Sequence, residues 1–278
     1  MSTQTASPSS SSQQLSKQAQ VCLEQAVEVP GAPLFHMGNV ANFKSKNSFD
    51  LLQGTINYLT CKARVKMPFS NDEKEFLIEL YESFWWGGHL KSMPEAANLA
   101  NHYVNGKGKA VAMNAKPYQN SVIVKDTIQA MKLYIKESAN KNENFFTLKT
   151  SNAKLRKSKH FKSIMLINGS RDKSSQGYAH SSGLIYTEAS NNRLKYADNR
   201  FYLEANTTKP TKDSFHTIWS VKNIYDFEPF SKGDKVSKFP LNTDKILELP
   251  DGLSEYMDSG LNIAKPYKYK ARWTEAWK

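Results

Sequence analysis

Two carboxylates late in the chain have a spacing that suits acid–base chemistry. Asp226 and Glu228 stand two residues apart in the segment Tyr-Asp-Phe-Glu-Pro, so in an extended backbone both side chains project to the same side. Such a pair can serve as general acid and general base, or can hold a divalent cation. The alternative is a pair of solvated acids in a turn, because Pro229 and Gly233 interrupt regular structure just after them.

Two histidines are the candidate proton shuttles for this acidic pair. His180 lies in Gly-Tyr-Ala-His-Ser-Ser-Gly, where an imidazole can act as a base beside small hydroxyl residues or can simply occupy a turn. His216 alternates with Ile218 in a predicted strand, so it reaches a catalytic face or is a half-buried strand residue. Asp198 and Arg200 are the candidate supporting residues.

Metal and thiol chemistry are less well supported. The six histidines show no HExxH motif and no paired ligand spacing, so we expect no zinc site and can name no cofactor. Cys61 is a candidate nucleophile, but its neighbours predict a strand interior rather than the helix N-terminus that commonly lowers a thiol pKa. With Cys22 it can form one bridge at most, so we expect the fold not to depend on disulfides.

The chain is strongly basic, with 38 Lys and Arg against 26 Asp and Glu and a formal net charge of +12. The excess concentrates between residues 149 and 173, which contain eight basic residues and one acid: Lys149, Lys154, Arg156, Lys157, Lys159, Lys162, Arg171 and Lys173, with Asp172. Dense cations attract phosphate backbones and anionic lipid head groups. We therefore predict that Arg156, Lys157 and Lys159 bind an anion, with Arg200 as a further contact; the alternative is a solvated loop.

A second basic run, residues 265–273, alternates cations with aromatic rings as Lys-Pro-Tyr-Lys-Tyr-Lys-Ala-Arg-Trp. Alternation of this kind is typical of stacking surfaces and of membrane interfaces. It is equally typical of an ordinary edge strand. The sequence leaves both interpretations open.

Apolar periodicity predicts helices in the first half of the chain. The expected helices cover residues 19–29, the segment from Ser70 to the Gly87-Gly88 pair with a capping box formed by Ser70 and Glu73, the segment from Ser92 through Pro94 to Asn105, and residues 124–135. By contrast, Ile56, Tyr58 and Thr60 predict a strand over 55–66.

Past residue 140 the pattern changes to short β-type segments separated by turns. The expected strands are 145–148, 162–167, 183–187, 193–196, 201–204 and 215–224. The predicted fold class is therefore α+β, with a mainly helical N-terminal half followed by an antiparallel β-sheet or barrel-like C-terminal half. We expect a disordered tail over 1–18, a mainly helical region over 19–145 and a mainly β region over 146–278, and one continuous domain fits almost as well.

No stretch approaches 18 consecutive apolar residues, so no membrane-spanning helix is expected. The Ser-, Gln- and Thr-rich first 20 residues have neither the basic nor the apolar region of a signal peptide. We therefore expect synthesis in the cytoplasm and, if the protein leaves its cell, export by a dedicated secretion system.

The order of motifs resembles uncharacterised bacterial proteins of the polymorphic-toxin and type VI secretion effector class. The resemblance rests on Ala97 to Gly108, Ala-Asn-Leu-Ala-Asn-His-Tyr-Val-Asn-Gly-Lys-Gly, and on strands ending in Ile-Tyr-Asp-Phe at 224–227. The Tyr-Asp-Phe segment is also similar to the acidic segment of colicin M-like toxins, which cleave the lipid-linked peptidoglycan precursor. The chain has Ser-Lys-Gly-Asp at 231–234 where that family carries a His-Arg pair.

This resemblance, with the basic charge, implies an exported antibacterial toxin that acts on an anionic target of a competing bacterium, first of all its cell envelope. The effector would be a hydrolase if it is an enzyme, and its expected partners are a cognate immunity protein and a component of the secretion apparatus. The alternatives are a nonenzymatic basic protein that binds nucleic acid or a membrane surface, and a pore-forming effector built on residues 76–86.

Overall fold

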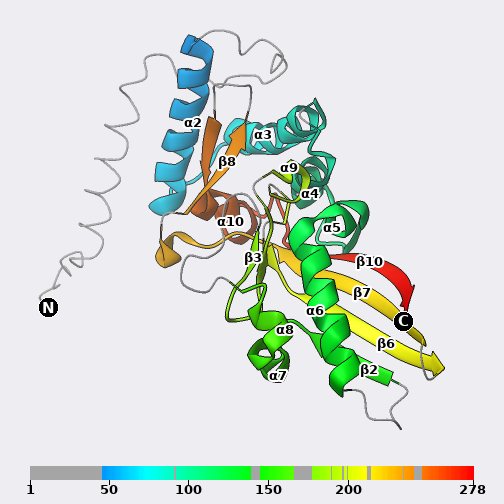
Figure 1. The fold of residues 1–278 in the computed structure, drawn as a ribbon. Helices are drawn as coiled ribbons and strands as arrows, with labels where there is room; N and C mark the ends of the chain where they lie inside the picture. The colour runs from blue at the N-terminus through cyan, green and yellow to red at the C-terminus, as the bar shows by residue number, and fades with distance from the viewer. Residues whose placement is uncertain are drawn as a thin grey trace, which may run out of the picture. The chain divides into compact units, whose positions relative to one another are not determined.

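The computed structural model describes residues 46–90, 92–138, 145–165, 177–188, 190–195, 197–198, 200–211, 214–233, 235–240 and 246–278. The chain divides into two compact units (Figure 1). Unit 1 combines the described residues up to 87 with 103–107 and 226–266, and unit 2 combines 88–102, 108–225 and 267–278. Unit 2 thus includes residues on both sides of the boundary predicted at residue 145. The tail predicted over 1–18 and the helix predicted over 19–29 lie outside the described residues.

Unit 1 is built mainly of helices around a small hairpin. Its elements are α2 (Lys46–Arg64), most of α3 (Asn71–Leu90), the short 3-10 helix η2 (Phe230–Lys232), β8 (Val236–Pro240), β9 (Ile246–Pro250) and α10 (Asp251–Ser259). Strands β8 and β9 pair in antiparallel fashion. Helix α2 packs against α10 and β9.

The strand predicted over 55–66 is wrong, because this segment belongs to helix α2. The alternation of β-forming residues there is coincidental. The buried residues are Leu52, Ile56 and Leu59, whose spacing of four and three places them on one face of a helix. Tertiary burial of that face outweighs the weak strand propensity of its β-branched and aromatic neighbours.

The capping box predicted at the start of the next helix is confirmed. The Ser70 backbone N–H donates to Glu73 Oε2 at 2.7 Å, and the Glu73 backbone N–H donates to Ser70 Oγ at 3.2 Å. Helix α3 nevertheless runs through Gly87 and Gly88 to Leu90, so the predicted glycine stop is wrong. A glycine costs a helix interior only about 1 kcal/mol relative to alanine, which packing elsewhere can offset.

Unit 2 contains two sheets and most of the remaining helices. Its helices are α4 (Pro94–Asn105, whose last turn belongs to unit 1), α5 (Lys116–Asn120), α6 (Val122–Ser138), α7 (Ala153–Lys157), α8 (Lys159–Lys162) and α9 (Asn192–Lys195). Helices α4 and α6 confirm the predictions made from apolar spacing.

The larger sheet has the strand order β1-β10-β7-β6-β2. Its strands are β1 (Val111–Met113), β2 (Phe145–Lys149), β6 (Leu203–Thr211), β7 (Ser214–Tyr225) and β10 (Tyr267–Trp277). Strands β1 and β10 are parallel and the other neighbours antiparallel. The sheet is open, with β1 and β2 at its two edges, so the α+β class holds and the barrel prediction is wrong. Strand β10 lies between β1 and β7, but β1 pairs only with Tyr269, Lys270 and Ala271, so on that side the other residues of β10 have no neighbour among the described strands.

The smaller sheet joins β3 (Tyr178–Ala179), β4 (Ile185–Tyr186) and β5 (Arg200–Phe201) in antiparallel order. Two predicted strands near it are corrected. Residues 193–196 fall largely in helix α9. The segment 162–167 begins at the end of α8, and Met165 forms an isolated parallel bridge with Ala179; residues 166–176 lie outside the described part.

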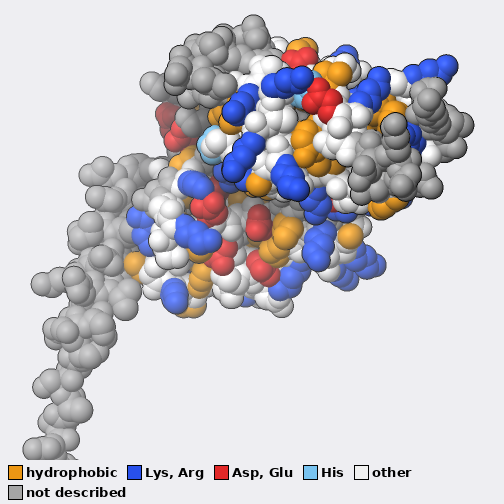
Figure 2. Space-filling view, turned by 60° about the horizontal axis from the view of Figure 1, so that its bottom comes forward, with side chains coloured by type: hydrophobic (Ala, Val, Ile, Leu, Met, Phe, Trp, Pro, Cys, Tyr) orange, Lys and Arg blue, Asp and Glu red, His pale blue; other side chains and the backbone are white. Residues whose placement is uncertain are grey.

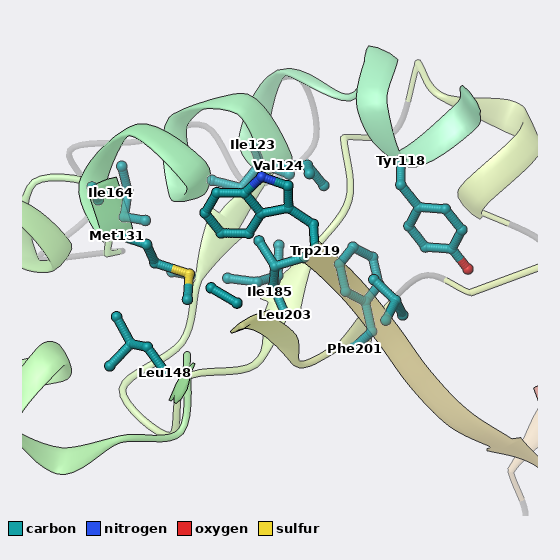
Figure 3. Close-up of a cluster of buried hydrophobic side chains, with 14 of the residues drawn as sticks. Tyr118, Ile123, Val124, Met131, Leu148, Ile164, Ile185, Phe201, Leu203 and Trp219 are labelled. Carbon is teal, nitrogen blue, oxygen red and sulfur yellow. The ribbon is translucent and has the colours of Figure 1, made fainter. Parts of the chain in front are cut away.

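Helix α6 covers one face of the larger sheet (Figure 1), and the core of unit 2 lies between them. Figure 3 shows Trp219 of β7 among side chains from α6, including Val124 and Met131, and from the strands. Trp219 is fully buried, and its Nε1 donates to Glu275 Oε2 at 3.0 Å. Lys132 on α6 donates to the other oxygen of Glu275 at 2.6 Å. The indole therefore buries a large apolar area with its one polar atom satisfied.

The buried ion pair between α2 and α3 gives a test of this fold. Lys62 donates to both oxygens of Glu73, at 2.6 and 2.7 Å, and both residues are less than a tenth exposed. Glu73→Gln should lower the free energy of unfolding by roughly 3 kcal/mol, because the Lys62 ammonium stays buried without a counter-charge. Urea denaturation measures the loss.

Asp72→Asn is the matched control, since Asp72 is exposed in the same helical turn. It should cost less than about 1 kcal/mol through the helix dipole alone. An equal loss of unfolding free energy in the two variants would show that the buried ion pair adds no stability beyond that of a negative charge in the first turn of α3.

Candidate functional site

The two carboxylates with catalytic spacing lie in unit 1, directly after strand β7 ends. Asp226 is exposed. Glu228 is half-buried and forms an ion pair with Lys235, whose Nζ lies 2.6 Å from Glu228 Oε1. His180, His216 and Asp198 all belong to unit 2. No single unit therefore brings a predicted proton shuttle to the acidic pair.

His180 occupies the tight turn between β3 and β4. Its backbone N–H donates to Leu184 O at 2.8 Å, and its carbonyl accepts from the Gly183 N–H at 2.8 Å. The ring Nδ1 accepts from the Ser182 N–H at 3.1 Å and lies 2.8 Å from Ser182 Oγ. Gly183 has φ of 90°, and a Cβ there would collide with the Thr150 carbonyl, so the turn requires glycine. These contacts fit the turn-histidine interpretation.

His216 lies on β7 and is exposed. Its register partners are Thr208 on β6 and Ala276 on β10. Because side chains directly opposite one another share a face, its nearest cross-strand neighbours are a hydroxyl and a methyl group. Neither of these two neighbours would prepare the imidazole for proton transfer.

Asp198 is the predicted residue whose environment is most unusual. It is only 4% exposed. Its Oδ2 accepts from the Tyr118 hydroxyl at 2.9 Å, its Oδ1 accepts from Asn223 Nδ2 at 3.2 Å, and the Tyr269 hydroxyl also bonds to it. The carboxyl thus joins α5, β7 and β10 to the segment that follows α9.

Burial dominates the electrostatics of this carboxyl. It raises the pKa of Asp198 to about 7, although the hydrogen bonds from Tyr118, Asn223 and Tyr269 act in the opposite direction. Burial and the neighbouring carboxyl also raise the pKa of Tyr118 and of Tyr269 above their ordinary value. Both phenols therefore stay protonated donors at neutral pH. Perturbed carboxyls of this kind gather at functional sites and in structural networks alike.

Of the predicted anion-binding residues, Arg156 is held by backbone carbonyls. Arg156 donates from Nε to Ser151 O at 3.2 Å and from Nη1 to Ser181 O, which ties α7 to the β3–β4 turn. Lys157 is exposed, and Lys159 pairs with Glu137 at 3.0 Å. Arg200 is exposed at the start of β5.

The larger basic feature is the face of the five-stranded sheet opposite α6. Strand alternation places five exposed cations on this face, here called the basic sheet face: Lys149, Lys222, Lys268, Lys270 and Arg272. Among the described residues Glu204 is the one acid on it, and it pairs with Lys222 at 3.1 Å and with Lys149 at 3.3 Å. In the part of the chain that the structure describes, no carboxylate pairs with the three cations of β10.

Figure 2 shows one side of the molecule, where blue Lys and Arg side chains spread widely and red Asp and Glu side chains are fewer. From the sequence, the run over 265–273 and Lys149 of β2 belonged to two separate basic clusters, and Lys222 of β7 was not predicted to join them. The feature that marked this run in the sequence was the alternation of Lys268, Lys270 and Arg272 with uncharged residues. Only the register shows that Lys222 lies directly opposite Lys270.

Cys61 is not a free thiol. It lies in helix α2 and is in a disulfide, so the thiol-nucleophile interpretation is wrong; Cys22 is outside the described residues. Nowhere in the described ranges do three His, Cys, Asp or Glu side chains gather to hold a metal ion. Of the helices that the structure describes, none is long and apolar enough to cross a membrane.

Comparison of the chain with protein-family models, with curated proteins and with solved structures gives no match. The resemblance to bacterial toxins therefore stays a prediction from the sequence.

The buried Asp198 carboxyl predicts a pH-dependent stability. Its pKa is raised from 3.8 to about 7 in the folded chain, so the folded state binds the extra proton and loses stability as pH rises from about 4 to about 7. Three pH units correspond to roughly 4 kcal/mol at most. Asp198→Asn should remove this fall in the free energy of unfolding, measured by urea denaturation between pH 4 and pH 8.

The exposed Asp72→Asn variant is the control and should follow the wild-type profile. A wild-type stability that rises over this window relative to Asp198→Asn would mean that the hydrogen bonds, rather than burial, set the pKa of Asp198.

Proposed function

We propose that this chain binds nucleic acid through the basic sheet face. The observation that carries the proposal is the excess of five exposed cations over one acid on the face of the larger sheet opposite α6. A polyanion neutralises such a surface and gains entropy from the counterions that it releases. The proposal takes up the nonenzymatic binding protein that the sequence offered as an alternative.

The arrangement of the cations favours a polymer over a single small anion. Lys268, Lys270 and Arg272 follow one another on β10 at intervals of about 7 Å, twice the rise of an antiparallel strand. Lys222 stands directly opposite Lys270. Like charges at opposed positions repel, and a bound phosphate between them would relieve that repulsion.

Polar side chains between the cations favour nucleic acid over a lipid surface. Exposed Thr147 and Thr208 and half-buried Asn206 share the face with the cations by strand alternation. Hydroxyl and amide groups commonly donate to the phosphates and sugars of nucleic acids. Insertion into a membrane needs a broad apolar face, and this face carries only separated apolar residues such as Phe145 and Ile224.

Within the effector hypothesis, nucleic acid is a target inside the competing cell. In that case we propose that the immunity partner carries an acidic surface complementary to the basic sheet face, and that a secretion apparatus delivers the chain. Neither partner is needed for the binding itself, so the proposal can be tested on the isolated protein.

Removing the β10 cations should weaken binding and reduce its salt dependence. For the triple variant Lys268→Gln, Lys270→Gln and Arg272→Gln, the slope of log K against log salt should fall by about 0.9 for each phosphate that the variant no longer neutralises. Fluorescence anisotropy of a labelled oligonucleotide over a salt series gives the slope.

A triple variant of Lys66, Lys107 and Lys125 to Gln is the matched control, because it removes the same charge from exposed positions off this face. It should keep nearly the wild-type slope. Equal effects of the two triple variants would mean that net charge alone, and no defined face, governs binding.

The envelope-directed effector is the second candidate, supported by the exposed Asp226 carboxylate at the end of β7. Inducible expression in a bacterial host separates the two. Nucleic-acid binding predicts growth arrest when the protein stays in the cytoplasm, whereas an envelope target predicts arrest only when it is fused to an export leader. In the latter case Asp226→Ala should abolish the arrest, and a toxic, folded Asp226→Ala protein would exclude the acidic pair.

A further inference from the structure

The three-stranded sheet of unit 2 has one buried row and one outward row. Ala179, Ile185 and Phe201 form the buried row, each at most 1% exposed. The residues that alternate with them are Tyr178, Tyr186 and Arg200, which are aligned across the three strands. Successive side chains of a strand point to opposite faces. The second row, here called the tyrosine platform, therefore points away from the core.

The two rings of the platform are already stacked. Their centroids lie 4.7 Å apart and their planes differ by 2°. Tyr178 and Tyr186 are both partly exposed, and Arg200 is exposed at the next position of the row. Because each ring uses one face in this stack, a nucleobase can stack only on an outer face, which for Tyr186 lies on the side of Arg200.

Two helices rich in cations, α7 and α8, lie next to this platform. The Ala179 N–H donates to Ile164 O at 3.1 Å, so the segment after α8 lies directly beside β3. Arg156 bonds to the β3–β4 turn through Ser181 O. Helices α7 and α8 carry five Lys and Arg and no acid: Lys154, Arg156, Lys157, Lys159 and Lys162. Of these, Lys159 pairs with Glu137 of α6 at 3.0 Å. These contacts place α7 and the end of α8 next to β3 and the turn that follows it.

We propose that the tyrosine platform stacks the bases of single-stranded nucleic acid while the cations of α7 and α8 hold its phosphates. The proposal rests on the nucleic-acid binding proposed above and names the preferred form of the ligand. Bases in a duplex are stacked on one another and hidden from such a platform, whereas those of a single strand are free to stack on protein rings. Tyrosine rings also stack on sugars, but a neutral glycan would leave the cations of α7 and α8 without a counter-charge.

The test compares two ring replacements. Tyr178→Leu with Tyr186→Leu removes both rings, whereas Tyr178→Phe with Tyr186→Phe keeps them and removes only the hydroxyls. Affinity is measured by fluorescence anisotropy for a labelled single-stranded DNA 12-mer, for its duplex and for polyphosphate, a polyanion without bases. A neutral chitin oligosaccharide is the fourth ligand. Thermal melting confirms that each variant is folded.

We expect the wild-type chain to bind the single strand more tightly than the duplex. The leucine pair should weaken single-strand binding at least tenfold while leaving polyphosphate binding unchanged, and the phenylalanine pair should bind like wild type. If the leucine pair does not fold, Tyr186→Leu alone, which also leaves the charge unchanged, should lower single-strand affinity in the same selective way.

Each contrary result overturns a different part of the proposal. A wild-type chain that binds neither DNA nor polyphosphate overturns the proposed function and the platform with it. A chain that binds all three polyanions alike, with no effect of the leucine pair, overturns the platform and leaves the basic sheet face intact. Binding of the chitin oligosaccharide that disappears in the leucine pair assigns the platform to a sugar and overturns base stacking.

Discussion

The pleat of the strand pair β7 and β10 fixes what each face of the larger sheet of unit 2 can do. All eleven residues of β10 pair with β7, so every side chain of one strand has a defined neighbour on the other. Trp219 and Val221 are thereby directed to the core under α6, and Lys222 and Lys270 to solvent. A shift of one residue would bury the lysines and expose the tryptophan. The register of β7 and β10 therefore determines both which side chains form the core and which cations lie on the basic sheet face.

At one end of the sheet, the same strand pair surrounds the buried carboxyl of Asp198. Asn223 of β7 and Tyr269 of β10 are register partners, and both donate to the same buried carboxyl. Charge in so dry an environment is unfavourable, which is why the pKa of Asp198 rises to about 7 despite its donors. The carboxyl therefore ties the strands to α5 at neutral pH with part of its population protonated, a structural role that also makes this end of the sheet sensitive to pH.

Sequence patterns predicted the helices better than the strands. Each of the helices beginning near Ser70, at Pro94 and at Val122 has an apolar stripe with helical period, and the structure confirms all three. The strand predicted over 55–66 is wrong because the segment has few β-forming residues. Their weak local propensity is outweighed by the burial of Leu52, Ile56 and Leu59 on one helical face. The strand predicted over 193–196 is wrong for a related reason: four residues are too few for a periodic pattern to distinguish a strand from the short helix α9.

By itself, the sequence determined the α+β class, the basic charge and the residues with chemistry to offer, because composition and period are local properties. Tertiary structure alone decided which of these residues meet. It placed Asp226 and Asp198 in different units, buried Asp198 among Tyr118, Asn223 and Tyr269, and stacked Tyr178 on Tyr186. Pairing across strands joins positions far apart in the chain, and no local pattern encodes that register; only the packing of the two sheet faces selects it.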